Sequence, residues 1–266
     1  MRSRATVSGR VSHSVLALIV VWGASAAAVS PAHAQLIGVG WSGLDSAAYT
    51  IDQNTGSGGF LGYTGFDSLN SLARDSLGTL YSVADSVLGQ ELITIHPSTG
   101  QGTSLATLGV SDIRAIAFSP TDALYAVVAG MKLVTVDTTT GQATSITDNM
   151  GASFVQGLAF SPGGDLYGWD AAVGLVTIDP VSGMASVVNA AAGGGGLVQT
   201  LAFRPDGQLY GARDALYEID PATGELTLIG TGSYLDVRGL EVIPEPTAGC
   251  LLVVAITMGL RRRTRG

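Results

Sequence analysis

The stretch "LAFSPGGDLYGWDAAVGLVTIDPVSG", residues 158–183, is the clearest copy of a repeat that fills the middle of the chain. Each copy contains four short apolar runs: one of the LAF type, one of the LYG type, one of the LVTID type and a looser fourth run such as residues 226–229. Pro-Gly-Gly-Asp follows the first run and Asp-Pro-Val-Ser-Gly follows the third, and both sequences favour tight turns. Each copy is therefore predicted to form four short strands.

The repeat recurs at a regular period. Related copies begin at Ile116 and Leu201, and a looser copy begins at Leu72. The glycine that ends each copy falls at Gly56, Gly100, Gly141, Gly183 and Gly224, with spacings of 44, 41, 42 and 41 residues. Four strands at this period are typical of a β-propeller blade. The middle of the chain has a general likeness to secreted repeat propellers such as those of the NHL type.

The two ends of the repeat region complement each other. Residues 36–41 match a second strand that has no first strand before it, and residues 237–242 match a first strand that nothing follows. Pairing them completes a blade and leaves no open sheet edge. The prediction is an all-β, five-bladed β-propeller of four-stranded blades over residues 35–243, closed by its N- and C-terminal strands. An open β-solenoid, which does not need complementary ends, is the alternative.

The first 34 residues have the pattern of a secretory signal peptide. Three arginines lie within the first ten residues, residues 15–21 form a short apolar core, and Ala-His-Ala precedes Gln35. Small residues at this place predict cleavage between Ala34 and Gln35 by signal peptidase, and hence export. A buried N-terminal helix is the alternative.

The last 23 residues combine three features in a fixed order. Pro244, Glu245 and Pro246 come first, the uncharged run 247–260 follows, and Arg261, Arg262, Arg263 and Arg265 end the chain. The run is short for a transmembrane helix, and its arginines would stay on the cytoplasmic side. This tail resembles a PEP-CTERM sorting signal.

That resemblance implies a bacterial envelope protein, held transiently in the inner membrane and cut at Pro-Glu-Pro by an exosortase, a membrane cysteine protease. It also implies surface attachment or release, often in organisms that make exopolysaccharide. A plain C-terminal membrane anchor is the alternative.

Composition excludes several classes of function. Six basic residues but all 21 acidic residues lie between Gln35 and Pro246, which gives this region a net charge of −15 against −8 for the whole chain. Such a field repels phosphate backbones, so no nucleic-acid partner is expected. Outside the two end segments there is no cysteine and one histidine, His96, which argues against zinc clusters and a Ser-His-Asp triad.

Alignment of the repeats places five polar residues at one equivalent position, the start of the first strand. These are Asn70, Arg114, Gln156, Gln199 and Arg238, and a small residue follows each of them. In a propeller they would ring one mouth of the central channel, where amides and guanidinium groups can bind sugar hydroxyls or a carboxylate. Uronic acids would suit the two arginines. The alternative is a structural role in satisfying backbone carbonyls between blades.

Two other sets of residues recur at defined places in the repeat. Asp52, Asp137, Asp179 and Asp220, with His96 in the same place, follow third strands and are predicted to cap turns. No metal site or cofactor is predicted. Ca²⁺ is only a weak option, because no clustered D-x-D-x-D loop is present. Trp41 and Trp169 fall at second strands and would either fill the wedge between blades or stack on sugars.

Three functions fit these observations. The first is a non-catalytic cell-surface or matrix protein that binds polysaccharide or another protein at the mouth. The second is a hydrolase or lyase acting on sugars or lactones with paired carboxylates, for which the loop residues Asp45, Asp67, Asp85, Asp112, Asp148, Asp170, Asp214 and Asp236 are the candidates. The third is a structural spacer or docking disc.

Overall fold

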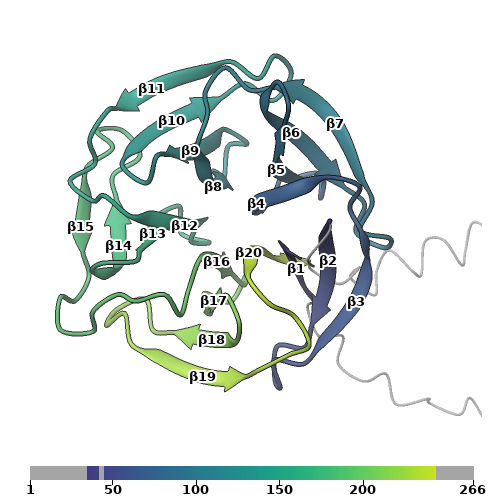
Figure 1. Cartoon of the computed structure of the whole chain (residues 1–266). Helices are drawn as coiled ribbons and strands as arrows, with labels where there is room; N and C mark the ends of the chain where they lie inside the picture. The colour runs from purple at the N-terminus through teal and green to yellow at the C-terminus, as the bar shows by residue number, and fades with distance from the viewer. Residues whose placement is uncertain (1–34, 42–44, 244–266) are drawn as a thin grey trace, which may run out of the picture. The chain divides into compact units, whose positions relative to one another are not determined.

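Five antiparallel sheets are arranged as blades around a common axis (Figure 1). The computed structural model describes residues 35–41 and 45–243, and every regular element within them is a β-strand. The predicted five-bladed β-propeller is therefore confirmed.

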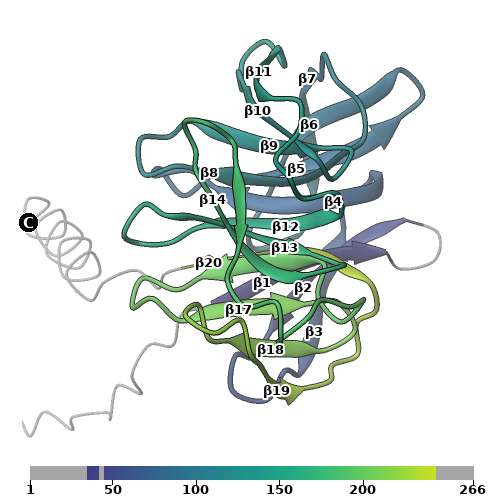
Figure 2. The same ribbon diagram turned by 90° about the vertical axis from the view of Figure 1, so that its left-hand side faces the viewer.

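The closing blade joins the two ends of the described chain. From the axis outward it contains β20 (Val237–Ile243), β1 (Gln35–Trp41), β2 (Ser46–Ile51) and β3 (Gly58–Tyr63). β1 and β20 are antiparallel, with Gln35 opposite Ile243 and Val39 opposite Gly239. The last described strand thus lies beside the first (Figure 2), and the open-solenoid alternative is wrong.

The other four blades follow in chain order, each with its first strand innermost. Blade 1 is β4 (Asp67–Arg74), β5 (Leu80–Ser86), β6 (Gly89–Ile95) and β7 (Gly102–Thr107). Blade 2 is β8 (Ile113–Phe118), β9 (Leu124–Val128), β10 (Lys132–Val136) and β11 (Ala143–Thr147). Blade 3 is β12 (Val155–Phe160), β13 (Leu166–Asp170), β14 (Gly174–Ile178) and β15 (Ala185–Val187). Blade 4 is β16 (Thr200–Phe203), β17 (Leu209–Ala212), β18 (Leu216–Ile219) and β19 (Leu226–Gly230).

The hydrophobic core lies between the blades. Five clusters of buried apolar side chains are present, and each joins one blade to the next, including the closing blade to blades 1 and 4. Three of the five junctions also contain a tyrosine of a second strand against a phenylalanine of the next blade's first strand, with ring centroids 5.0–5.3 Å apart. Burial between neighbours explains why one blade alone is not a stable unit.

The turn after each third strand has one construction. Asp137 Oδ1 accepts hydrogen bonds from the backbone N–H groups of Thr139 and Thr140, both at 2.8 Å, and the N–H of Gly141 donates to the Asp137 carbonyl. Gly141 has φ = 74°, a left-handed conformation that glycine adopts without a steric penalty.

The same turn recurs in the other four blades, with the capping residue at the equivalent place in each repeat. Asp52, Asp179 and Asp220 each accept a backbone N–H two residues on, and His96 Nδ1 accepts that of Ser98. Hydrogen bonds from backbone amides lower the pKa of the exposed Asp137 and Asp179 carboxyls. The predicted capping role of these residues is confirmed.

The predicted signal peptide and sorting tail fall at residues 1–34 and 244–266, outside the described residues. The proposed cleavage site after Ala34 and the motif residues Pro244, Glu245, Pro246, Arg261, Arg262 and Arg263 lie there too. Among residues 35–41 and 45–243 no helix has the length and apolar character needed to cross a membrane.

Candidate functional site

The five aligned polar residues line one hollow at an end of the ring axis. A cavity of about 290 Å³ is bounded by Asn70, Arg114, Gln156, Gln199, Arg238 and one further residue, Asp112. We call this end of the axis the mouth. The five were brought together by alignment of the repeats, whereas Asp112 was predicted only as one of eight loop aspartates considered for catalysis.

Three of these side chains project from β-bulges. Arg114, Gln156 and Arg238 are each skipped in the pairing of an innermost strand with its neighbour, so that two residues face one on the partner strand. A bulge turns its extra residue out of the ladder and re-aims the side chain. The repeated bulge is therefore the local feature that directs these polar groups toward the axis.

Arg114 is held by the aspartate two residues before it. Its Nε and Nη2 atoms each donate to a separate carboxylate oxygen of Asp112 at 3.1 Å. Asp112 has φ = 61°, an uncommon conformation for a residue with a side chain, and the paired fork offsets part of its cost. The Arg114 charge is thus balanced within its own blade.

Asp236 is the centre of a larger network. Its Oδ2 accepts bonds from Arg238 Nε at 2.9 Å and Nη2 at 2.8 Å, and its Oδ1 accepts one from Gln199 Nε2 at 2.6 Å. Arg238 Nη1 also donates to Asn70 Oδ1 at 3.3 Å. The network links the first strands of blade 1 and the closing blade with the residue that precedes the first strand of blade 4.

The environment of Asp236 keeps it ionised. Burial acts to raise its pKa, but hydrogen bonds from Gln199 and Arg238 and the positive charges of Arg238 and Arg213 outweigh burial, so the pKa is lowered. Asp236 is therefore a fixed negative partner of Arg238 and is poorly suited to donate a proton.

Gln156 differs from its neighbours in the ring. Its side chain lines the mouth, and within the described residues its amide makes no hydrogen bond to another side chain or to the backbone. A half-buried amide with unused donor and acceptor positions can bind a polar group of a ligand directly.

The two tryptophans lie in opposite environments. Trp169 of β13 is fully buried between blades 3 and 4, whereas Trp41, at the end of β1, is 54 % exposed. Trp41 borders a second cavity of about 330 Å³, whose other walls include Ser68, Asp236 and Arg238. Because Arg238 lines both cavities, this side cavity adjoins the mouth.

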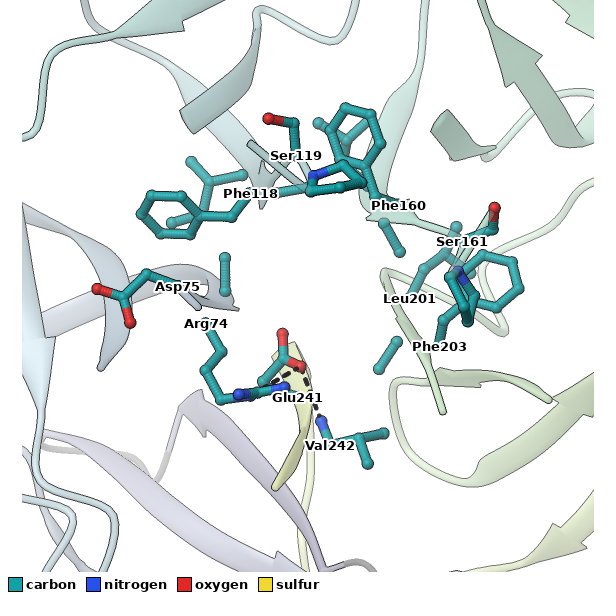
Figure 3. A pocket seen from close by; sticks show the side chains of 18 of the residues that line it. Arg74, Asp75, Phe118, Ser119, Phe160, Ser161, Leu201, Phe203, Glu241 and Val242 are labelled. Atoms are coloured by element: carbon teal, nitrogen blue, oxygen red, sulfur yellow. Dashed lines mark hydrogen bonds and ion pairs between the residues drawn. The ribbon is translucent and has the colours of Figure 1, made fainter. Parts of the chain in front are cut away.

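The opposite end of the axis, which we call the exit, has different chemistry. A cavity of about 390 Å³ lies between the ends of the innermost strands; Arg74 and Glu241 lie together on one side of it, and Phe118, Phe160 and Phe203 line it from the other blades (Figure 3). Arg74 Nε lies 4.0 Å from Glu241 Oε1, which also accepts the Val242 N–H at 3.1 Å.

Glu241 is a half-buried carboxyl whose pKa is raised. Burial raises its pKa to about 7, even though the Arg74 charge and the backbone amides of Val242 and Arg74 act in the other direction. Its side chain is only 20 % exposed. Sequence analysis did not single out Glu241, because a glutamate in a strand gives no sign of what faces it.

Several loop aspartates considered for catalysis are engaged in structural contacts. Asp170 accepts the backbone N–H of Ala172 in the turn after β13 and that of Phe154, which precedes β12, and Asp148 pairs with Lys132. Asp85 accepts a bond from Gln90, and Asp214 accepts the Asp236 N–H. Asp112 and Asp236, the two at the mouth, are each held by an arginine.

Within the described residues no group of three or more His, Cys, Asp and Glu side chains gathers as metal ligands would. The four turn aspartates lie in four different blades, and their side-chain oxygens bind backbone amides.

Comparison with known proteins reveals the fold alone. No protein-family model matches the chain, and no curated protein matches it. Among solved structures, it is similar to a symmetrical protein whose de novo evolutionary emergence is shaped by folding constraints, with 18 % identity and a TM-score of 0.55, over 80 % of this chain and 100 % of that one.

Two further structures show the same likeness. One is from a nidogen/laminin complex, with 11 % identity and a TM-score of 0.56 over 80 % of this chain and 99 % of that one. The other is a protein of unknown function from Bacteroides thetaiotaomicron, with 16 % identity and a TM-score of 0.51 over 75 % and 56 % of the two chains. Because propellers support many unrelated functions, these similarities establish a five-bladed β-propeller and leave its ligand to be argued from the site.

Proposed function

We propose that this chain is an exported, non-catalytic β-propeller that binds an extracellular polysaccharide, or the glycan of a surface protein, at the mouth. One observation carries the proposal: five polar residues from five repeats converge on a single cavity. Amide and guanidinium groups at fixed positions suit a ligand rich in hydroxyls.

The charges at the mouth favour a neutral ligand over an acidic one. Arg114 and Arg238 are paired with Asp112 and Asp236, so the two positive charges that would attract a uronic acid are already balanced. The surrounding protein is strongly acidic, which adds a repulsion against polyanions. Hydrogen bonding to hydroxyls does not depend on net charge and is unaffected.

The described part of the chain begins and ends at the same end of the ring. β20 runs from the mouth, where it carries Arg238, to Ile243, which lies opposite Gln35. Both ends of the described chain therefore lie at the exit end. In our proposal the PEP-CTERM-like tail holds the protein in the inner membrane until an exosortase cuts it.

Gln156→Ala is expected to weaken glycan binding about tenfold, because the amide bonds a ligand and no other group of the protein. Binding is measured by calorimetry against neutral and acidic bacterial exopolysaccharides. Gln142→Ala, an equivalent change at an exposed turn, is the matched control and should bind as the wild type does. Equal affinities of the two variants, or no saturable binding to any polysaccharide, would refute the mouth as the binding site.

Changing Pro244, Glu245 and Pro246 together to alanine tests the sorting tag. In a host that makes an exosortase, the wild-type protein is expected to lose its C-terminal segment, and the variant is expected to stay uncut in the membrane fraction. Mass spectrometry of the C-terminal peptide measures both. Loss of the same C-terminal segment from both proteins, or from neither, would show that the motif is not a cleavage signal.

A further inference from the structure

We propose that Trp41 is a stacking platform for a neutral pyranose and that the side cavity it borders continues the mouth into one extended oligosaccharide site. The inference rests on the proposed function, since it names the class of sugar and the path it takes from the mouth.

Trp41 is unusually exposed for a tryptophan. A tryptophan is highly buried on average in a folded protein, and Trp169 on another second strand is completely buried. Trp41 instead keeps 54 % of its surface open on the wall of a cavity of about 330 Å³. About half of the Trp41 surface is thus accessible to a ligand.

Polar side chains share the side cavity with the indole of Trp41. Ser68, Asp236 and Arg238 line the same cavity. Within the described residues the Ser68 hydroxyl makes no hydrogen bond, and the Arg238 guanidinium retains two N–H groups after its bonds to Asp236 and Asn70. A pyranose has an apolar C–H face and a rim of hydroxyls, which match an aromatic face and a polar wall respectively.

The mouth and the side cavity adjoin each other. Arg238 lines both the mouth and the side cavity, and each cavity is near the lower limit of about 300 Å³ for small-ligand pockets. Two adjoining cavities of this size that share a donor suit consecutive units of a chain-like ligand. The Asp236–Arg238 pair between them is electrically balanced, which favours neutral sugars at the junction.

The test uses the full-length protein and three neutral probes, the hexasaccharides of β-1,4-, β-1,3- and α-1,4-linked glucose, with hexagalacturonate as the acidic probe. We expect at least one neutral probe to bind and to change tryptophan fluorescence, and hexagalacturonate to bind at least tenfold more weakly. Trp41→Ala should lose at least fivefold in affinity together with the fluorescence change, whereas Trp41→Phe should retain most of the affinity.

Phe60→Ala is the matched control, because Phe60 is 60 % exposed on the same blade but lines neither cavity. It should bind like the wild type, and equal melting temperatures would show that the variants are folded. If Gln156→Ala weakens binding and Trp41→Ala does not, the mouth is a binding site and the stacking platform is refuted. If no neutral probe binds but hexagalacturonate does, the assigned sugar class is wrong. If no probe binds, the inference is overturned, and the polysaccharide panel above decides the proposed function separately.

Discussion

Replacing Glu241 by glutamine is expected to make the protein more stable than the wild type above pH 7, by up to about 3 kcal/mol, and to leave stability near pH 4.5 unchanged. The reason is the difference between the pKa of about 7 in the folded protein and the ordinary value of 4.5. Each unit of this difference corresponds to about 1.4 kcal/mol. Glutamine resembles the protonated carboxyl and carries no charge to bury.

The sign follows from proton linkage. Between pH 4.5 and 7 the folded state binds more protons at Glu241 than the unfolded state, so the free energy of unfolding falls as pH rises through this window. Aspartates with lowered pKa, such as Asp137 and Asp236, act in the opposite direction at lower pH, where stability is lost as pH falls. They are common to both proteins, so the difference between the two stability curves isolates Glu241.

Urea unfolding from pH 4.5 to 8.5 measures both curves. The charged groups that share the exit cavity with Glu241 are Arg74, Arg204, Asp75 and Asp122. Arg74→Gln should extend the decline to higher pH, since it removes the positive charge that acts to lower the Glu241 pKa. A difference curve between wild type and Glu241→Gln that stays flat from pH 5 to 8 would contradict a raised pKa.

The places of Glu241 and Arg74 in the repeat show which contact of the other blades their charge pair replaces. Glu241 lies opposite Ile37 in the closing blade, where the other blades pair an alanine with a tyrosine, as in Ala159 opposite Tyr167. Arg74 occupies the place taken by phenylalanine in Phe118, Phe160 and Phe203, as its pairing with Leu80 shows. At the junction of the closing blade with blade 1, an ion pair therefore replaces the aromatic contact of three other junctions.

The fold was predictable because its signals are local and repeat. The capped turn that ends at Gly141 contains all of its determinants within five residues, and the same turn recurs in every blade. Once the period was known, alignment converted sequence positions into places in the ring. That is why Gln156 and Arg238, far apart in the chain, could be assigned to the same mouth.

Contacts that depend on backbone direction could not be predicted in this way. Asp112 and Asp236 stand two residues before the aligned mouth residue of their blades. In two other blades Phe154 and Leu197 hold that place. The positive φ of Asp112 and Asp236 places each carboxylate against the arginine that follows. The bulges that aim these arginines have no distinctive residue of their own.

The contrast between the tryptophans has a similar cause. Trp169 lies opposite Gly157 within the ladder of blade 3, at the position that Val39 takes opposite Gly239 in the closing blade. Trp41 comes two residues later, where the pairing of β1 with β20 has ended. A displacement of two residues keeps the side chain on the same face but moves it beyond the edge of the core, and the sequence did not fix where that edge lies.

Gly239→Ala is expected to destabilise the protein by about 3 kcal/mol, equivalent to a fall of roughly 10 °C in melting temperature. A Cβ atom on Gly239 would lie 2.4 Å from the carbonyl carbon of Ser71 and 2.6 Å from the Leu72 nitrogen, on the backbone of β4. Neither atom belongs to a flexible side chain, so the closing blade would have to move away from blade 1.

The residues after each mouth position are all small, namely Ser71, Ala115, Gly157, Thr200 and Gly239, because the innermost strands converge on the axis. Thermal unfolding followed by circular dichroism measures the cost, with Gly163→Ala as the control. Gly163 lies in an open turn, where an added Cβ would meet no described atom closer than 3.5 Å, and its variant should stay within about 0.5 kcal/mol of the wild type. Equal melting temperatures for the two variants would mean that β20 and β4 approach less closely than the structure has them. A large loss confined to Gly239→Ala would confirm a close backbone contact at the junction where the last strand closes the ring.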